Sequence, residues 1–438
     1  MTPGPIFDID KIFSLVRGKA VEAEVYQSQS ESRPVIFKAN RLKSAEANLS
    51  CGASLRIVAD GNTGFATTND PNGLESLAER ALRSARYGGK AHFSLPGTCK
   101  YDEVPRTYYG ETAEHGRDAK ITSGEETIRR LLEKAPGVNI DLEVETGFSK
   151  MTLSNLRGLS LSQEKTWYSF GFSMLNVDKN GLLWISRGNT SSRVEDKSSR
   201  LAEEALFLLE KSAWVQPVGR PQVVILEPDV VGLLVSSFLA GLNGKTVQKG
   251  TSPLSKKLGQ TITDARFSLI EDPFIKDRPT SSPFDDEGIP RRKNALIDRG
   301  VAKMFVYDLE TAGITGSKPT GNGERGYSSL PAPGFSNLII PTGPKPVKEI
   351  LKGVKNGLWI HSVLGSGQSN MLAGDFSLNA HLAYKIENGE ITGRVKDTMI
   401  SGNVYDIFNK ITEISSEQDD TGSRFFPSIA FEGIKVNG

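Results

Sequence analysis

Residues 231–259 read VGLLVSSFLAGLNGKTVQKGTSPLSKKLG, and they divide into two halves of different character. The first half, Val231 to Leu242, is almost wholly apolar, which predicts a buried helix. The second half is rich in Gly, Lys and Ser and ends on Lys257-Leu258-Gly259, a composition typical of a loop. Together they predict a core helix followed directly by a polar loop.

The chain after this helix is predicted to consist mostly of strands joined by tight turns. Arg299-Gly300 and Asn388-Gly389 each separate two strand-like runs. Asn-Gly readily adopts the positive φ angles of a two-residue hairpin turn, so the second of these is the clearest hairpin in the chain. Pro346–Val354 predicts a short helix, and Ser428–Val436 predicts the final strand.

The first half of the chain mixes helices with strands. A hairpin is predicted at Asp60-Gly61, and a meander of strands over Val138–Ser192 with a turn at Asn180-Gly181. Asp70 and Pro71 are expected to begin one helix, and Ser123 to begin another as the first residue of a capping box. The predicted helices are Ile6–Arg17, Asp70–Tyr87, Ser123–Ala135 and Lys197–Trp214.

These elements predict an α+β protein of two domains. Antiparallel hairpins predominate, and the helices do not alternate strictly with strands, which excludes a doubly wound sheet. The segment Val215–Pro221 contains two prolines and a glycine, as linkers often do. We therefore expect an N-terminal α/β domain with antiparallel hairpins over residues 1–214, and a C-terminal β-rich domain over residues 215–438.

Composition excludes several classes of protein. Hydrophobic residues make up 37% and charged residues 24%, as in a globular protein, and the formal net charge is only +1 without a basic stripe. We therefore expect no nucleic-acid partner. Cys51 and Cys99 form no CxxC pair, which suits a reducing cytoplasm. No apolar run is long enough for a membrane span and no signal sequence is visible, so we expect no membrane role.

Two groups of residues have patterns that could bind a cofactor or a metal. Gly321-Asn-Gly-Glu-Arg-Gly326 matches GxGxxG by letter, but no helix is predicted after it, so a nucleotide site is not expected. His361 and His381 lie on predicted strands and could meet across a sheet, with Asp285 as a possible third metal ligand. We favour the simpler interpretation of two polar residues on half-buried strands.

Asp285, Asp286 and Glu287 form a run of three carboxylates between two prolines. Such a run could bind a hard cation or provide an acid/base pair. Adjacent residues seldom converge on one ion, so we favour an acidic turn whose carboxylates cap backbone N–H groups or pair with Arg291 and Arg292. Asp285 and Asp286 remain candidates for contact with a substrate.

The segment Thr315–Asn337 is the longest run without predicted secondary structure in the second half. Long ordered loops in compact domains are often functional. Asn322, Arg325 and Tyr327 offer an amide, a charge and an aromatic face, and they could line a groove for an extended peptide bound by strand addition. A solvated surface loop would have the same composition.

An ordered series of short motifs resembles the TldD/PmbA family, once named modulators of DNA gyrase. Residues 249–259 resemble the family pattern KGxSxxxxKLG. A second family pattern, near the N-terminus, resembles Gly52-Ala-Ser-Leu-Arg-Ile-Val-Ala-Asp-Gly61. Ser282–Gly288, Thr320–Gly323 and Gly374-Asp-Phe-Ser377 resemble the PmbA, or TldE, branch. The resemblance runs over nearly the whole chain.

In the TldD branch of that family, His-Glu-x-x-x-His on the helix before the KGxS segment binds zinc. Its three positions fall here on Val235, Ser236 and Ala240, none of which is a zinc ligand. A third ligand of that branch, a cysteine, should fall near Asp419. The resemblance therefore places this chain with the PmbA/TldE-like branch, without a metal or catalytic residue of its own.

The resemblance implies a non-catalytic subunit of a cytoplasmic TldD–TldE type zinc metallopeptidase. A TldD-like catalytic subunit would form a heterodimer with it, supply the zinc and process small or unfolded peptides. The alternative is a stand-alone homodimeric protein that binds peptides without proteolysis.

Overall fold

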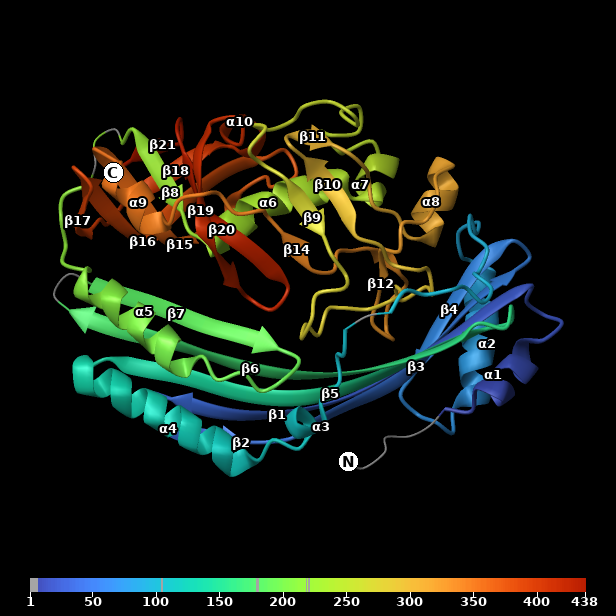
Figure 1. The fold of residues 1–438 in the computed structure, drawn as a ribbon. Helices are drawn as coiled ribbons and strands as arrows, with labels where there is room; N and C mark the ends of the chain where they lie inside the picture. Colours follow the sequence, from blue (N-terminus) through green and yellow to red (C-terminus); the bar gives the residue numbers. More distant parts are fainter. Residues whose placement is uncertain (1–6, 104, 179–180, 218, 220) are drawn as a thin grey trace.

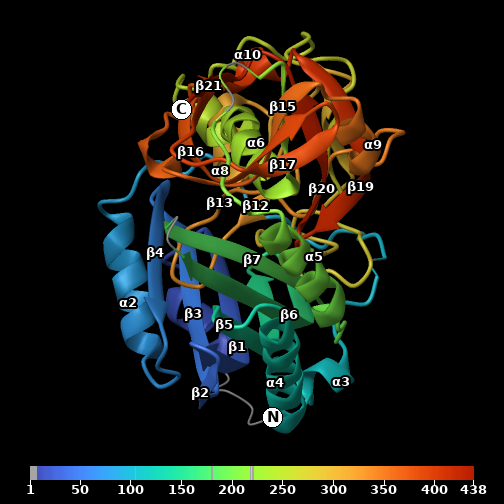
Figure 2. The ribbon, with the colours of Figure 1, turned by 90° about the vertical axis from the view of Figure 1, so that its left-hand side faces the viewer.

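The computed structural model describes residues 7–103, 105–178, 181–217, 219 and 221–438. A long, curved antiparallel sheet forms one layer, and a second sheet with its helices rests on it (Figure 1). Seen from one end, the first sheet lies below and the second above, with helix α5 (Ser198–Glu210) near the junction (Figure 2). Mixed helix and antiparallel sheet in two layers confirm the predicted α+β class.

The first sheet has seven strands, in the order β4-β3-β1-β5-β6-β7 with β2 paired to β1. Its central pairing, β5 with β6, runs in continuous register from Asn139↔Leu175 to Ser154↔Ser160. The strands are β1 (Glu22–Lys38), β2 (Arg41–Ala45), β3 (Asn48–Ala59), β4 (Asn62–Thr68), β5 (Asn139–Asn155), β6 (Ser160–Asp178) and β7 (Gly181–Ser191).

The predicted turns of this sheet agree with its backbone. Asp60 and Gly61 have φ angles of 51° and 79°, as a hairpin turn with two positive φ values requires. The meander predicted over residues 138–192 is confirmed as β5, β6 and β7. The turn predicted at Asn180-Gly181 falls partly outside the described residues.

Helices α1 (Ile9–Val16) and α2 (Leu74–Ala85) cover one end of the first sheet, and α4 (Arg117–Lys134) and α5 cover the other (Figure 1). Between them lies the short α3 (Gly110–Ala113).

Two predicted helix starts are wrong. Asp70 accepts a hydrogen bond from the Asn72 N–H before α2, whose N-cap is Gly73.

The other wrong start is Ser123, which lies in the middle of α4. The buried Lys120 keeps the preceding turn helical, because its ammonium donates to the Arg33 carbonyl and to Thr146 Oγ1. This tertiary contact outweighs the local capping pattern at Ser123.

The second sheet has twelve strands and is mixed, with β8 parallel to β15 and β14 parallel to β20. Its strands are β8 (Val223–Leu226), β9 (Leu269–Glu271), β10 (Asn294–Asp298), β11 (Val301–Ala302), β14 (Leu338–Ile339), β15 (Asn356–Leu364), β16 (Asp375–Glu387), β17 (Glu390–Arg394), β18 (Met399–Asn403), β19 (Ile411–Asp420), β20 (Arg424–Phe431) and β21 (Lys435–Asn437). The remaining elements are α6 (Pro228–Leu242), α7 (Gly244–Gln248), α8 (Leu309–Thr315), β12 (Gly323–Glu324), β13 (Ala332–Pro333), α9 (Val347–Lys352), η1 (Ser366–Gln368) and α10 (Val404–Ile407).

Most predictions for this half are confirmed. The apolar run at residues 231–242 forms most of α6. Both predicted hairpins have positive φ angles at their turns. The φ angles of Arg299 and Gly300 are 45° and 80°, and those of Asn388 and Gly389 are 50° and 83°. The single final strand predicted over Ser428–Val436 is wrong, since β20 ends at Phe431 and the separate strand β21 follows. The division at residue 215 stays a prediction, and it lies between α5 and β8.

A continuous apolar core joins the two layers. Leu201 and Leu208 of α5 pack in one cluster with Ile225 of β8, Trp359 of β15 and Tyr384 of β16. Among the described residues, no helix is long and apolar enough to cross a membrane.

Candidate functional site

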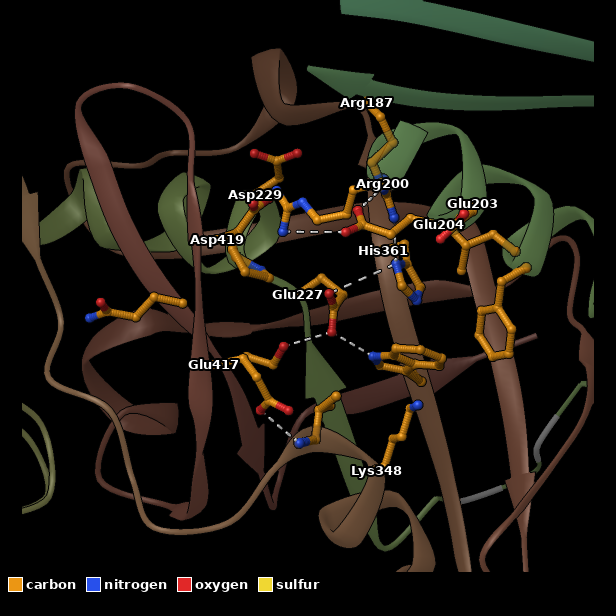
Figure 3. Close-up of a pocket in the computed structure, with 17 residues that line it drawn as sticks. Arg187, Arg200, Glu203, Glu204, Glu227, Asp229, Lys348, His361, Glu417 and Asp419 are labelled. Carbon is orange, nitrogen blue, oxygen red and sulfur yellow. Dashed lines mark hydrogen bonds and ion pairs between the residues drawn. The ribbon is translucent and has the colours of Figure 1, made fainter. Parts of the chain in front are cut away.

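A pocket of about 450 Å³ opens where α5 and β7 of the first layer meet the second sheet. We call it the acidic pocket (Figure 3). The residues that line it are Arg187, Arg200, Glu203, Glu204, Phe207, Leu208, Glu227, Pro228, Asp229, Val347, Lys348, Trp359, His361, Glu417, Gln418, Asp419 and Ser428.

Glu227 lies in the middle of this pocket, immediately before α6 (Figure 3). Its side chain does not cap the helix. It accepts hydrogen bonds from Trp359 Nε1 at 2.6 Å and Ser428 Oγ at 2.7 Å. Burial raises the pKa of Glu227, and the two hydrogen bonds oppose that shift because they favour the carboxylate. Two donors, on the strands β15 and β20 that flank β8, therefore fix the orientation of Glu227.

His361 of β15 forms the buried wall of the pocket, with 4% of its side chain exposed. Its Nδ1 lies 3.9 Å from Glu227 Oε2 and 3.4 Å from Arg187 Nη2. Burial, with Arg187 beside the ring, lowers the pKa of His361 well below its usual value. The ring is therefore neutral at pH 7 and can accept a hydrogen bond from Arg187 at Nδ1.

Carboxylates outnumber cations along the lining. The lining has three cationic side chains, those of Arg187, Arg200 and Lys348. It has six carboxylates, those of Glu203, Glu204, Glu227, Asp229, Glu417 and Asp419. Arg187 and Arg200 each pair with Glu204 at 3.4 Å. Burial and then repulsion from Asp419 raise the pKa of Asp229. A cationic group placed here would relieve that repulsion, so the electrostatics suit an ammonium or a guanidinium.

The residues at the zinc-motif positions do not fit a zinc ion. Val235 is fully buried in the core of the second layer. The hydroxyl of Ser236 donates to the Leu233 carbonyl within its own helix, and Ala240 has no donor side chain. Asp419, in the acidic pocket, is the only possible ligand of the four positions, and one ligand cannot hold zinc. Across the part of the chain that the structure describes, no group of three or more His, Cys, Asp or Glu could hold a metal ion.

The structure gives the two strand histidines different neighbours. His361 contacts Arg187, Glu227, Trp359 and Tyr384. His381 packs against Trp184 and accepts a hydrogen bond from its N–H at 3.4 Å. The two sets of contacts have no residue in common.

The acidic run forms a buried turn. Asp285 accepts hydrogen bonds from the N–H groups of Glu287, Ile289 and Gly323, as expected for a carboxylate that caps the backbone. Glu287 pairs with Arg56 of β3 at 2.8 Å, and its other oxygen accepts from the Leu309 N–H. Burial raises the pKa values of Asp285 and Glu287, while Arg291 and Arg56 oppose the shift.

Arg325 joins the same network. Its Nη2 donates to Glu24 Oε1 at 2.7 Å, and its guanidinium stacks over the Tyr26 ring at 4.6 Å. Glu24 also pairs with Arg56 at 3.0 Å. The side chains of Glu24 and Arg325 are both fully buried. This network ties β1 and β3 of the first layer to loops of the second.

The segment over residues 315–337 is more ordered than predicted. Its strands β12 and β13 pair with each other, and no helix follows Gly326, so the nucleotide fingerprint lacks its structural context. Asn322 is buried and donates to both oxygens of Glu271 and to the Gly334 carbonyl. Tyr327 packs against Tyr26 and Leu153. These contacts stabilise the segment, and its role in binding a peptide stays a prediction.

Sequence reasoning missed Glu227, Asp229 and Arg187. The two carboxylates flank Pro228 at the start of the apolar helix, and two acids before a buried helix are a visible signal. Arg187 carries no such signal, because its partner His361 becomes a neighbour only when the layers pack together.

Comparison with known proteins places this geometry in context. Residues 219–438 match the model of the PmbA/TldA metallopeptidase C-terminal domain, and residues 23–85 match that of PmbA/TldA metallopeptidase domain 1. A metalloprotease TldD homolog of Haemophilus influenzae is 30% identical over 93% of this chain and 88% of its own.

Two solved structures share the whole fold. TldE from Thermococcus kodakarensis superposes with a TM-score of 0.90 at 25% identity, covering 98% of this chain and 100% of that one. A protein of Thermotoga maritima, named as a modulator of a DNA gyrase, has a TM-score of 0.86 at 26% identity, covering 98% and 99%.

Proposed function

Because this chain belongs to the PmbA/TldA metallopeptidase family, we propose that it is the non-catalytic, TldE-like subunit of a two-chain zinc peptidase. A TldD-like partner would bind the zinc, which activates water for hydrolysis of an amide bond. This chain would form part of the enclosure for a small or unfolded peptide. Its likeness to TldE over the full length supports the assignment to that branch.

One observation carries the proposal: α6 uses the first of its motif positions for packing, and the other two, Ser236 and Ala240, have no zinc-binding side chain. Val235 has no exposed surface and belongs to the apolar core. A histidine at that position would place an imidazole among aliphatic side chains, at a cost of about 1–3 kcal/mol for an unsatisfied polar group. The helix is therefore built as a scaffold, and hydrolysis would require ligands from another chain.

The acidic pocket supports a role in binding peptides. Its excess of carboxylates suits a lysine or arginine side chain, or a free amino terminus. Glu227 is held by Trp359 and Ser428, so its carboxylate is preorganised to accept a charged hydrogen bond.

The direct test is to purify the chain alone and measure its zinc content and its cleavage of unfolded peptides. We expect less than one tenth of an equivalent of zinc and no cleavage. The same assay after co-expression with a TldD-like chain from the same genome should show stoichiometric zinc and cleavage. Stoichiometric zinc together with hydrolysis by the lone chain would exclude the proposal.

A pull-down from the native cell separates the heterodimer from the alternative. Recovery of a paralogue that carries His-Glu-x-x-x-His would support the non-catalytic subunit. Recovery of this chain alone, with a dimeric mass in solution, would instead support a homodimeric peptide-binding protein.

A further inference from the structure

A second cavity, of about 490 Å³, lies between the first sheet and the loops of the second layer. Its floor comes from β1, β5 and β6, and its roof from residues 279–291 and 324–325. The lining residues are Tyr26, Ser28, Ser149, Lys150, Met151, Gln163, Lys165, Pro279, Thr280, Ser282, Phe284, Asp286, Arg291, Glu324 and Arg325. A volume of this size falls within the range of small-molecule sites, about 300–1,000 Å³.

Lys165 is the unusual residue of this cavity. It is half-buried on β6, and within the described ranges its ammonium has no ion pair and no hydrogen-bond acceptor. Burial, with Arg291 nearby, lowers the pKa of Lys165 to about 8, while Asp286 and Glu324 act in the opposite direction less strongly. An ammonium that is partly desolvated in a cavity and has no acceptor is favourable for a ligand that supplies one.

Two buried arginines add further unused donors. Nη1 of Arg291, and both Nε and Nη1 of Arg325, lack hydrogen-bond partners among the residues that the structure describes. The side chain of Arg291 is 7% exposed and that of Arg325 is fully buried, so water does not replace the missing acceptors. Arg291 is nevertheless engaged elsewhere, because its Nη2 donates to Glu324 at 3.3 Å and its Nη1 lies 3.8 Å from Glu271 Oε1. Among the described residues, Lys165 is therefore the cation of this cavity that has no carboxylate partner.

The remaining lining residues restrict the kind of ligand that the cavity can bind. Asp286 and Glu324 are also present, and a dianionic phosphate would meet their repulsion. Burial raises the pKa of Glu324 to about 7, which reduces the negative charge near the cations. Tyr26, Met151 and Phe284 supply apolar surface, and Ser28, Ser149 and Thr280 supply hydroxyls.

We propose that this cavity binds a small organic carboxylate, such as an amino acid or the carboxyl end of a short peptide. Lys165 holds the carboxylate, Arg291 adds positive charge beside it, and Asp286 accepts hydrogen bonds from the amide or ammonium end. The site lies on one chain and uses none of the zinc-motif positions. It therefore does not depend on whether the chain is a peptidase subunit.

Calorimetric titration of the purified full chain with glycylglycine, acetate and inorganic phosphate tests the site. At pH 7 we expect glycylglycine to bind at one equivalent, acetate more weakly, and phosphate weakest of all. Binding of acetate should weaken about tenfold near pH 9.5, because the ammonium of Lys165 is then neutral while the charge of acetate does not change. Phosphate binding more tightly than glycylglycine, or no heat with any of the three, would overturn the proposal.

Lys165→Met removes the charge and keeps the length of the side chain. Binding of glycylglycine should fall at least about tenfold, and Lys165→Arg should retain most of it. Lys38→Met is the matched control, because Lys38 of β1 lies outside the cavity lining, pairs with Asp141 at 2.9 Å and has 52% of its side chain exposed. That variant should bind within about twofold of the unmodified chain.

Thermal stability separates a binding role from a structural one. If the ammonium of Lys165 is kept for a ligand, Lys165→Met should raise the melting temperature of the ligand-free chain while it abolishes binding. A lower melting temperature with unchanged binding would show that Lys165 is structural, and would overturn the assignment.

Discussion

Single residues connect the two layers of this protein through buried charge. Arg56 on β3 is 3% exposed and pairs with both Glu24 and Glu287, which are themselves fully buried. Such pairs add little net stability when they form, because desolvation offsets the attraction. Loss of one member is far more damaging, because the remaining charges stay buried without compensation.

We predict that Arg56→Met lowers the free energy of unfolding by about 3–5 kcal/mol. Glu287 would keep only the Leu309 N–H as a donor. Urea denaturation at pH 7 measures the change. The control is Arg129→Met, which breaks an exposed pair with Glu133 on α4 and should change stability by less than about 0.5 kcal/mol. Equal effects of the two substitutions would contradict the assigned role of Arg56.

His361 should make stability depend on pH. Its pKa is lowered in the folded protein, so below about pH 6.5 the unfolded chain takes up a proton that the folded chain refuses. The free energy of unfolding should therefore fall as pH decreases from 6.5, by up to about 1.4 kcal/mol per pH unit. Glu227 and Asp229, whose pKa values are raised, act in the opposite direction above about pH 4.5.

The difference between variants isolates the histidine. Denaturation of His361→Gln between pH 7.5 and 5.5 should show a shallower loss of stability than that of the unmodified chain. His92→Gln, at an exposed position, should leave the slope unchanged. A parallel slope in His361→Gln would mean that His361 titrates normally in the folded protein.

Among the elements, α4 shows how tertiary packing overrides a local pattern. The capping box at Ser123 is present in sequence, yet the helix begins six residues earlier, at Arg117. The residue after Ser123 explains part of the packing. Gly124 lies against the ring of the buried Phe37 of β1, and an added Cβ would come within 2.3 Å of that ring.

We predict that Gly124→Ala destabilises the protein, although alanine favours helices by about 1 kcal/mol over glycine. Overpacking against Phe37 costs about 1–3 kcal/mol and should outweigh that gain. Gly110→Ala is the control, since an added Cβ there meets nothing within 4 Å. In a double-mutant cycle, Phe37→Leu should relieve the effect of Gly124→Ala; strict additivity would exclude the contact as its cause.

For the whole molecule, the shared core predicts cooperative unfolding. Leu201 and Leu208 of α5 belong to one apolar cluster with Trp359 and Tyr384 of the second sheet, so this cluster is complete only when the two layers pack together. The buried ion network crosses the same junction.

Two variants that each retain a single tryptophan test this cooperativity. Trp167 on β6, whose indole donates to Glu145 of β5, reports on the first layer, and Trp359 on β15 reports on the second. We expect coincident urea midpoints from both fluorescence signals and from far-UV circular dichroism. Two separate midpoints would show that the layers unfold independently.

The sequence by itself determined the local features of this protein. Asp60-Gly61, Arg299-Gly300 and Asn388-Gly389 indicated turns correctly, because positive φ is a property of a few residues and their neighbours. The apolar run from Val231 predicted its buried helix for a similar reason, since composition alone signals burial. The absence of zinc ligands at Val235, Ser236 and Ala240 also needed no coordinates.

Only the tertiary structure decided which polar groups meet. Arg325 and Glu24 are separated by 301 positions, and Arg187 reaches His361 across 174. In the sequence, Lys165 cannot be distinguished from any other strand lysine. Its cavity forms only because the second layer packs over the first sheet. Pairing and desolvation of charges depend on long-range packing, and that packing leaves no periodic signal in the sequence. Both cavities therefore form only where the two layers meet, and the sequence alone does not predict them.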